Sequence, residues 1–172
     1  MARAAARQGS KAPRIELRQA RTAGELASTV AIFREYAASL DVDLCFQNFD
    51  AELVSLPGEY APPSGQLLLA YVDAELAGCG ALRPFADADD GNACEMKRLY
   101  VRPAYRGLGL GRMVAEALLD EARRAGYSAM LLDTLDDMES ARELYASLGF
   151  VEIPPYYFSP IAGAHYLKAE LK

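Results

Sequence analysis

The sequence predicts a single mixed α/β domain, and three observations support that fold class. The chain has 172 residues, a length that suits one domain, since ~100–200 residues per domain is usual. Apolar residues make up 52% and charged residues 24% of the chain, which is the balance of a globular protein with a core. Helix and strand periodicities alternate without a repeat or an internal boundary, in the order β-α-α-β-β-β-α-β-α-β-β.

Hydrophobic periodicity, helix caps and turn residues predict each element in turn. Residues 1–13 contain arginine and alanine but no acidic residue, and they predict a disordered tail. The folded domain is therefore expected to span residues 14–172. In chain order we expect a strand at 15–17, a helix over 23–40 capped by Thr22, a loop with a short helix over 41–56, a connection over 57–65, strands over 66–72, 75–82 and 93–101, a glycine-rich loop over 102–111, a helix over 112–125, a strand over 129–133, a helix over 138–148, and late strands over 150–153 and 165–171.

The charge and hydropathy of the chain exclude several classes of protein. The 18 basic and 24 acidic side chains give a net charge of −6, which argues against the broad basic surface of a nucleic-acid-binding protein. No stretch approaches the ~20 apolar residues of a membrane span. The N-terminus also lacks the apolar segment of a secretory signal. We therefore expect neither a nucleic-acid nor a membrane partner.

Cysteine and histidine usage predicts no metal site and a reducing compartment. Cys45, Cys79 and Cys94 are odd in number and widely spaced, and His165 is the one histidine of the chain. This set cannot form a common zinc site. Unpaired cysteines are typical of a cytoplasmic protein. Cys94 is expected in the core, and His165 is interpreted as an ordinary strand residue.

The strongest functional signal is a glycine-rich junction between a strand and a helix, in the segment MKRLYVRPAYRGLGLGRMVAEALL at residues 96–119. Gly107, Gly109 and Gly111 let the backbone turn tightly and approach a ligand closely. The helix that follows begins with free N–H groups and a positive dipole end. Together these features predict an anion cradle, most naturally for phosphates. A tight turn without a ligand is the alternative.

Three phosphate-binding interpretations compete for this loop. A P-loop requires a lysine after the last glycine, and the chain has Arg112 there. A dinucleotide fingerprint requires G-x-G-x-x-G, but Val114 occupies the third glycine position after Gly109 and Gly111. Asp133 follows at the distance of a ribose-binding acid, so NADH binding would distinguish this interpretation from a coenzyme A site.

The third interpretation rests on the motif Arg106-Gly107-Leu108-Gly109-Leu110-Gly111. It matches the pattern Arg/Gln-x-x-Gly-x-Gly/Ala, and with the downstream segments AMLLDT and ARELYASLGF it resembles the GCN5-related N-acetyltransferase (GNAT) superfamily. The resemblance covers about residues 66–153. It implies a central, mostly antiparallel sheet with a splayed strand pair and flanking helices, and acetyl-CoA as co-substrate.

The resemblance also implies a set of cofactor contacts made largely by the main chain. The pyrophosphate of coenzyme A would lie on the backbone of the glycine loop, and the pantetheine arm along the strand before it. The implied cofactor-binding residues are Leu99, Tyr100, Val101, Arg106, Gly107, Leu108, Gly109, Leu110, Gly111 and Arg112. One departure from the family is Met138, where many relatives have an asparagine, and Ser140 is the candidate replacement.

Two residues are expected to carry catalysis if the resemblance holds. Tyr145 occupies the family position that protonates the leaving thiolate, although a packing role on the apolar helix face is the alternative. Glu95 is the expected base, and the alternative is a solvated strand glutamate paired with Lys97 or another cation. Lys97 and Arg98 are expected on opposite faces of the strand, because strand side chains alternate.

The acceptor end is expected in two aromatic segments, with Phe46, Gln47, Tyr156 and Tyr157 as substrate-binding residues. The predicted function is an acetyl-CoA-dependent N-acetyltransferase that acetylates a primary amine of a small molecule by direct attack in a ternary complex. A non-catalytic acyl-CoA sensor, a protein or peptide acetyltransferase, and a dinucleotide-binding domain are the alternatives. The resemblance further allows a homodimer that pairs through the late strands.

Overall fold

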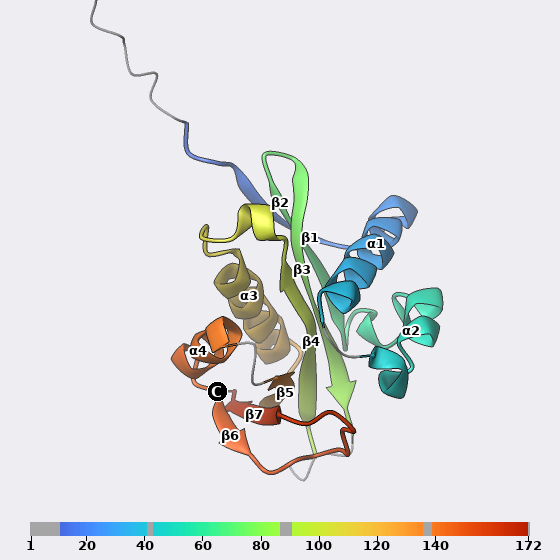
Figure 1. The fold of residues 1–172 in the computed structure, drawn as a ribbon, viewed down its shortest axis with the longest axis vertical. Helices are drawn as coiled ribbons and strands as arrows, with labels where there is room; N and C mark the ends of the chain where they lie inside the picture. Colours follow the sequence, from blue (N-terminus) through green and yellow to red (C-terminus); the bar gives the residue numbers. More distant parts are fainter. Residues whose placement is uncertain (1–10, 41–42, 87–90, 136–138, 172) are drawn as a thin grey trace, which may run out of the picture.

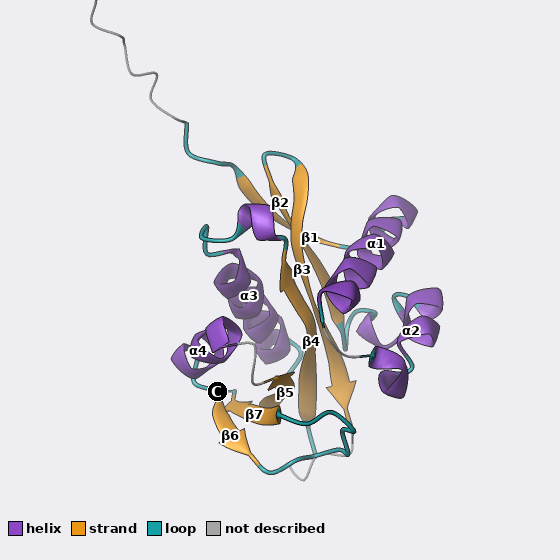
Figure 2. Cartoon of the chain, in the orientation of Figure 1, coloured by secondary structure: helices purple, strands orange, loops and turns teal. Residues whose placement is uncertain are grey.

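The computed structural model describes residues 11–40, 43–86, 91–135 and 139–171. These residues form one seven-stranded sheet with helices on both faces (Figures 1 and 2). The elements are β1 (Ile15–Gln19), α1 (Ala23–Ser39), η1 (Leu44–Gln47), α2 (Phe49–Ser55), η2 (Gly58–Tyr60), β2 (Gln66–Val72), β3 (Glu75–Phe85), β4 (Ala93–Val101), η3 (Pro103–Tyr105), α3 (Leu110–Arg124), β5 (Ala129–Leu135), α4 (Glu139–Ser147), β6 (Val151–Ile153) and β7 (Ala164–Glu170).

The sheet contains one pair of strands that separates part of the way along. Its strand order is β1-β2-β3-β4-β5-β7-β6, and every described neighbouring pair is antiparallel except β4 and β5. These two run parallel and pair only over Ala93 to Glu95 opposite Ala129 to Leu131. Beyond that point lies the β4–β5 fork, residues 96–101 of β4 and 132–135 of β5. The predicted mostly antiparallel sheet with a splayed pair is confirmed.

The two faces of the sheet carry separate cores. Figure 1 shows α1 and α2 on one face and α3 and α4 on the other. Ile32 and Phe33 of α1 are fully buried against the first face, and Val114 and Leu118 of α3 against the second. A capping box between Thr22 and the third helical residue begins α1, as the sequence predicts.

Element boundaries differ from the sequence prediction mainly where tertiary pairing extends a strand. β3 continues to Phe85 and β5 to Leu135, because antiparallel partners in β4 and β7 continue beside them. α3 begins at Leu110, two residues early, because Gly109 caps it. Residues 11–14 have no regular structure, and the rest of the predicted tail lies outside the described residues. Within the described chain, no helix is both long and apolar enough to cross a membrane.

Candidate active site

The glycine-rich loop ends in an open helix N-terminus. Gly107 and Gly109 have φ angles of +88° and +78°, in the left-handed region that favours glycine. Gly109 is the N-cap of α3, and no side chain caps the helix there. The first N–H groups of an α-helix lack intrahelical partners, so those that begin at Leu110 remain for an external acceptor. With the positive dipole end, they form the cradle geometry that the sequence predicts.

A groove of about 510 Å³, here called the large groove, lies beside this cradle between α1, β4 and α4. The predicted cofactor-binding residues that line it are Leu99, Tyr100, Val101, Arg106 and Gly111. The other five do not line it, and the Leu110 side chain is buried in the core, so only its backbone is free to meet a ligand. A Cβ on Gly111 would lie 3.6 Å from Leu144, so glycine keeps the space between α3 and α4 open.

Polar side chains frame the large groove. Arg106 donates from Nε to a backbone carbonyl at the end of β4, at 3.2 Å. Arg112 donates to the hydroxyl of Ser147 at 2.6 Å and thereby connects α3 to α4. Ser140 lines the groove, whereas Met138 lies outside the described residues. Two arginines beside an open helix N-terminus make this region locally positive in an otherwise acidic protein.

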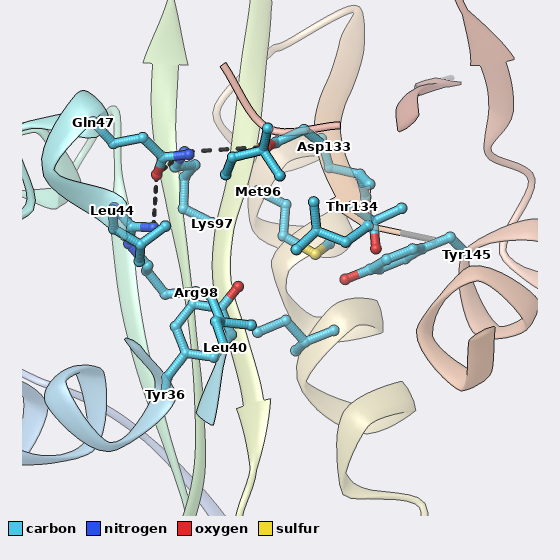
Figure 3. A pocket seen from close by; sticks show the side chains of 14 residues that line it. Tyr36, Leu40, Leu44, Gln47, Met96, Lys97, Arg98, Asp133, Thr134 and Tyr145 are labelled. Atoms are coloured by element: carbon cyan, nitrogen blue, oxygen red, sulfur yellow. Dashed lines mark hydrogen bonds and ion pairs between the residues drawn. The ribbon is translucent and has the colours of Figure 1, made fainter. Parts of the chain in front are cut away.

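The β4–β5 fork holds a smaller central cavity of about 50 Å³. It shares Tyr36, Leu40 and Leu99 with the large groove, so the two spaces adjoin. Figure 3 shows the hydroxyls of Tyr36 from α1 and Tyr145 from α4 pointing into the cavity from opposite sides. Burial raises the pKa of Tyr36 to about 12 and also raises the pKa of Tyr145. Both phenols are therefore protonated at neutral pH.

The environment of Tyr145 suits both roles that the sequence allows. Its side chain is buried, and its ring packs edge-on against Phe150 with centroids 5.7 Å apart. Its hydroxyl nevertheless lines the cavity. The packing fixes the ring, and the fixed ring presents a protonated hydroxyl to the fork.

A β-bulge brings Lys97 and Arg98 to the same side, so the expectation that they lie on opposite faces is wrong. In the register between β3 and β4, Gly80 faces two residues where one would be regular, and Arg98 has a φ of +61°. Such a bulge resets the alternation of side chains. Both cations donate to Oε1 of Gln47, Lys97 at 3.1 Å and Arg98 at 2.8 Å. Both side chains are buried, so neither serves to solubilise the strand.

Arg98 is held by a buried, two-bond ion pair. Its Nε and Nη2 atoms donate to the carboxylate of Glu52 on α2 at 3.0 and 3.2 Å, and its guanidinium lies over the Phe49 ring at 5.1 Å. Planar bidentate pairing of this kind is the strong form of an ion pair. Arg98 therefore joins the bulged strand to α2.

The buried charge of Lys97 is compensated more weakly than that of Arg98, and the Lys97 ammonium faces a carboxylate across the fork. Its ammonium lies 4.0 Å from Oδ1 of Asp133 on β5, as the dashed line in Figure 3 marks. Burial is the main reason that the pKa of Lys97 is lowered. Oδ2 of Asp133 accepts a hydrogen bond from the hydroxyl of Tyr157 at 2.6 Å. Asp133 thus receives one hydrogen bond and one longer charge contact.

Glu95 is buried in a denser network than Asp133. Its side chain is 1% exposed. Oε1 accepts a hydrogen bond from Nε of Arg83 at 2.9 Å and lies 2.8 Å from Nη2 of the same guanidinium as an ion pair. Oε2 accepts from the hydroxyl of Tyr156 at 2.7 Å. Arg83 also pairs with Glu59 beyond the sheet edge. Glu95 is therefore not solvated, but it is paired with a cation other than Lys97, as the alternative to a base role allowed.

A third space, the charged groove of about 300 Å³, opens on the other side of the central cavity. It shares Gln47, Lys97 and Arg98 with that cavity. Its lining residues are Gln47, Asn48, Glu52, Arg83, Phe85, Glu95, Lys97, Arg98, Tyr157 and Phe158. The large groove, the central cavity and the charged groove therefore adjoin one after another along the fork, and this series of spaces is here called the path.

The predicted acceptor residues gather around the charged groove. Gln47 and Tyr157 line it, and the amide of Gln47 reaches the Tyr157 hydroxyl at 3.5 Å. Tyr156 does not line the groove, but its hydroxyl bonds Glu95, which does. Phe46 lies in η1, but its side chain falls outside the described part of the structure. Two segments about 110 residues apart thus meet at one groove, as the sequence predicts.

Sequence reasoning missed the charged residues that line the path. It gave Tyr36 and Arg83 no role, and it read Asp133 only as a mimic of a ribose-binding acid. The polar end of the apolar strand AMLLDT could have indicated Asp133, because an acid at that point must face the fork. No local signal indicates Arg83, whose partners lie 12 and 24 residues away.

No metal cluster competes with this interpretation in the described residues. They contain no group of three His, Cys, Asp or Glu side chains arranged to hold a metal ion. Nδ1 of His165 lies 2.8 Å from the carboxylate of Glu152, away from the path. Cys94 is fully buried, as predicted.

Comparison with known proteins agrees with this geometry. The chain matches the model of the acetyltransferase (GNAT) family over residues 28–150. It is 42% identical over 141 residues to an uncharacterized N-acetyltransferase of Schizosaccharomyces pombe, covering 81% of this chain and 85% of that protein.

Two solved structures are similar in fold. A GNAT-family acetyltransferase of Staphylococcus aureus Mu50 matches with a TM-score of 0.75 at 19% identity, covering 92% of this chain and all of that one. The PaiA N-acetyltransferase of Thermoplasma acidophilum, solved with coenzyme A, matches with a TM-score of 0.68 at 16% identity, covering 91% and 99% of the two chains. From the family match, the close relative and the forked sheet, the chain belongs to the acetyltransferase (GNAT) family.

Proposed function

We propose that this GNAT acetyltransferase transfers the acetyl group of acetyl-CoA to a primary amine of a small molecule, by direct attack in a ternary complex. The observation that carries the proposal is the path of adjoining spaces from an anion cradle, past Tyr145, to a separate charged groove. Such a path lets the two substrates enter from opposite sides and meet at the fork. The catalytic domain is proposed to span residues 14–172.

Acetyl-CoA is proposed to occupy the large groove. Its pyrophosphate would accept hydrogen bonds from the loop and first helical turn at Gly107 to Arg112, and its pantetheine arm would run beside Leu99 to Val101. Beyond Glu95 no described strand pairs with β4 on its β5 side, so backbone groups there are available to the pantetheine amides. The coenzyme A in the Thermoplasma structure supports this placement through the shared fold. Ser140 is proposed to replace the missing asparagine.

The chemistry requires a proton acceptor for the ammonium, and a proton donor for the leaving thiolate. Tyr145 is proposed as the donor, since its hydroxyl is protonated and faces the cavity. Glu95, the base expected from the sequence, lines the charged groove. Asp133 is a second carboxylate on the path, and it lies in the cavity itself.

A small acceptor suits the size and composition of the charged groove. A volume of about 300 Å³ lies at the lower end of the range of small-molecule sites, ~300–1,000 Å³. Its carboxylates favour an amine, and its arginines and Lys97 also accommodate an acidic group on the same molecule. Gln47, Tyr157 and the neighbouring Phe46 and Tyr156 are proposed to orient the acceptor.

The test is release of free thiol from acetyl-CoA in the presence of polyamines, amino acids, aromatic amines and lysine-containing peptides. Release with a small amine supports the proposal, and release with peptides alone would point to a protein acceptor. Calorimetric binding of coenzyme A without any release would point to an acyl-CoA sensor. Absence of coenzyme A binding would overturn the cofactor assignment.

Two coarser expectations accompany this function. The three cysteines are free thiols, which supports a reducing compartment and hence the cytoplasm. β6 is the outermost strand on its side of the sheet, and its Val151 is 63% exposed. We propose that this edge pairs two copies into a homodimer, which light scattering of the purified protein would test.

A further inference from the structure

Two carboxylates lie on the same face of the fork, and their surroundings differ. Glu95 on β4 and Asp133 on β5 both project toward the side covered by α2 and by residues 154–163, here called the β6–β7 segment. There they meet Arg83, Tyr156 and Tyr157. A carboxylate offers about four acceptor positions on its two oxygens. Glu95 receives two hydrogen bonds and a close ion-pair contact at 2.8 Å, whereas Asp133 receives one hydrogen bond and an ion-pair contact at 4.0 Å.

Position also separates the two carboxylates. Asp133 and Tyr145 line the same central cavity, whereas Glu95 lines only the charged groove beyond it. The Asp133 side chain is 18% exposed and that of Glu95 is 1% exposed. A group that takes a proton from the attacking nitrogen must lie within hydrogen-bond reach of it. The nitrogen must in turn lie near the thioester, and therefore near Tyr145.

We infer that Asp133 is the carboxylate that receives the acceptor ammonium and takes its proton, and that Glu95 is a positioning residue. This inference rests on the proposed function. Oδ1 of Asp133 has Lys97 as a neighbour at 4.0 Å, beyond hydrogen-bond distance, so an ammonium can approach it. The hydroxyl of Tyr157 occupies Oδ2 and fixes the orientation of the carboxylate.

The proton balance closes with groups that line the cavity. The acceptor ammonium gives one proton to Asp133, and the neutral amine attacks the thioester carbon. The new C–N bond forms, the C–S bond breaks, and the thiolate takes the proton of the Tyr145 hydroxyl. The second proton leaving nitrogen restores the Tyr145 hydroxyl, and the proton on Asp133 passes to solvent. The net products are the amide, coenzyme A and one proton.

Glu95 has a different task in this arrangement. It connects Arg83 of β3 to Tyr156 of the β6–β7 segment, and Arg83 connects onward to Glu59 of η2. β3, β4 and the β6–β7 segment therefore meet at one buried carboxylate, and η2 is connected to it through Arg83. Loss of its charge leaves Arg83 without its buried partner, which alters the shape of the charged groove rather than the protonation of the acceptor.

Most ionisable groups around Asp133 keep the same charge through the neutral range, so proton uptake by Asp133 can be recognised in a pH profile. They come from each element packed against it: Tyr36 of α1, Lys97 of β4, Tyr145 of α4, Tyr156 and Tyr157 of the β6–β7 segment, and Tyr166 of β7. The pKa values of these tyrosines are all raised, so the phenols remain neutral through the neutral range. Lys97 is the group whose charge can change as pH rises.

The test compares Asp133→Asn with Glu95→Gln, each of which removes a charge and keeps the size of the side chain. Rates of thiol release are measured from about pH 6 to about pH 9.5 with the best amine of the panel, below that amine's own pKa. Asp133→Asn is expected to lower kcat/KM ~100-fold near pH 7, and the deficit shrinks as the free amine becomes abundant. Glu95→Gln is expected to raise the acceptor KM by a factor that is constant across pH. Asp133→Glu should recover part of the loss.

Folding and the underlying reaction are controlled separately. Calorimetric affinity for coenzyme A should match wild type in both variants, because neither residue lines the large groove. An Asp133→Asn deficit that is small or constant with pH overturns the inference, as does a pH-dependent deficit in Glu95→Gln. Failure of the wild-type protein to release thiol with every amine overturns the proposed function, and the inference falls with it.

Discussion

The two ends of the path through the fork are built in different ways. The large groove is lined mainly by small, apolar and tyrosine side chains of α1, β4 and α4, and the backbone cradle at the start of α3 lies beside it. The charged groove is formed by long side chains that reach one another from η1, α2, β3, β4 and the β6–β7 segment. A backbone cradle tolerates changes in most side chains, whereas a network of buried charges depends on each member. We therefore expect mutations at the two ends to fail differently.

The largest effect is expected from breaking the buried ion pair of the charged groove. The Glu52 side chain is 13% exposed, and Arg98→Met removes its bidentate partner. We expect the unpaired carboxylate to cost ~3–5 kcal/mol of unfolding free energy. Urea denaturation measures it. Arg102→Met is the matched control, because Arg102 pairs with Glu35 at 2.8 Å with both side chains 32% or more exposed, and such surface pairs contribute ~1 kcal/mol or less. Equal losses in the two variants would contradict the contrast.

The next largest effect is expected at the junction of the two grooves. Tyr145→Phe keeps the ring packing but removes the hydroxyl, and we expect kcat to fall ~100-fold while the acetyl-CoA KM changes little. Steady-state kinetics of thiol release measures both. Tyr127→Phe is the control, since its hydroxyl bonds the Ser64 carbonyl at 2.7 Å, away from the path. Wild-type turnover in Tyr145→Phe would leave Tyr145 with packing alone.

At the cofactor end, a negative charge at the N-terminus of α3 should weaken coenzyme A binding, whereas the same charge elsewhere should not. Gly109→Asp places a carboxylate at the open N-terminus of α3, and we expect coenzyme A affinity to fall by about 2 kcal/mol, or ~30-fold. Gly126→Asp shares the positive φ, +88° against +78°, but lies at the opposite end of the same helix. Calorimetry should find its affinity unchanged, although both variants lose some stability from backbone strain. Similar losses of coenzyme A affinity in both variants would contradict the placement of the pyrophosphate at the glycine loop.

The smallest effect is expected for Lys97→Met, and its sign depends on pH. Burial lowers the folded-state pKa of Lys97 below its ordinary value of 10.5. The unfolded state therefore binds more protons between those two values, and wild-type stability rises with pH across that window. The Met variant lacks this rise. Urea denaturation at pH 7 and at about pH 10 should find Met relatively more stable at pH 7, and a constant difference would contradict the expectation.

The same contrast explains how much the sequence could predict. The glycine turn and the open helix start at the cofactor end were predicted from the sequence, because Arg106 to Gly111 is contiguous and its glycines serve a local backbone geometry. The charged groove could not be predicted in this way, because Arg98 reaches it through a β-bulge. The positive φ of Arg98, +61°, leaves no trace in residue type. Asp133 and Lys97 are 36 residues apart in the chain and meet only because β4 and β5 pair in parallel.

The fork also gives the sheet an interior edge. Beyond Glu95, β4 is paired on one side by β3 and is open on the side toward β5, although the helices cover both faces of the sheet (Figure 1). An exposed edge elsewhere would invite another chain to add a strand, whereas this edge lines the large groove at Leu99 to Val101. A cofactor that completes the hydrogen bonding of a sheet binds the native state alone, and at 100 times its Kd it adds about 2.7 kcal/mol of stability. The lifetime of the protein against proteolysis would then follow the supply of its own co-substrate.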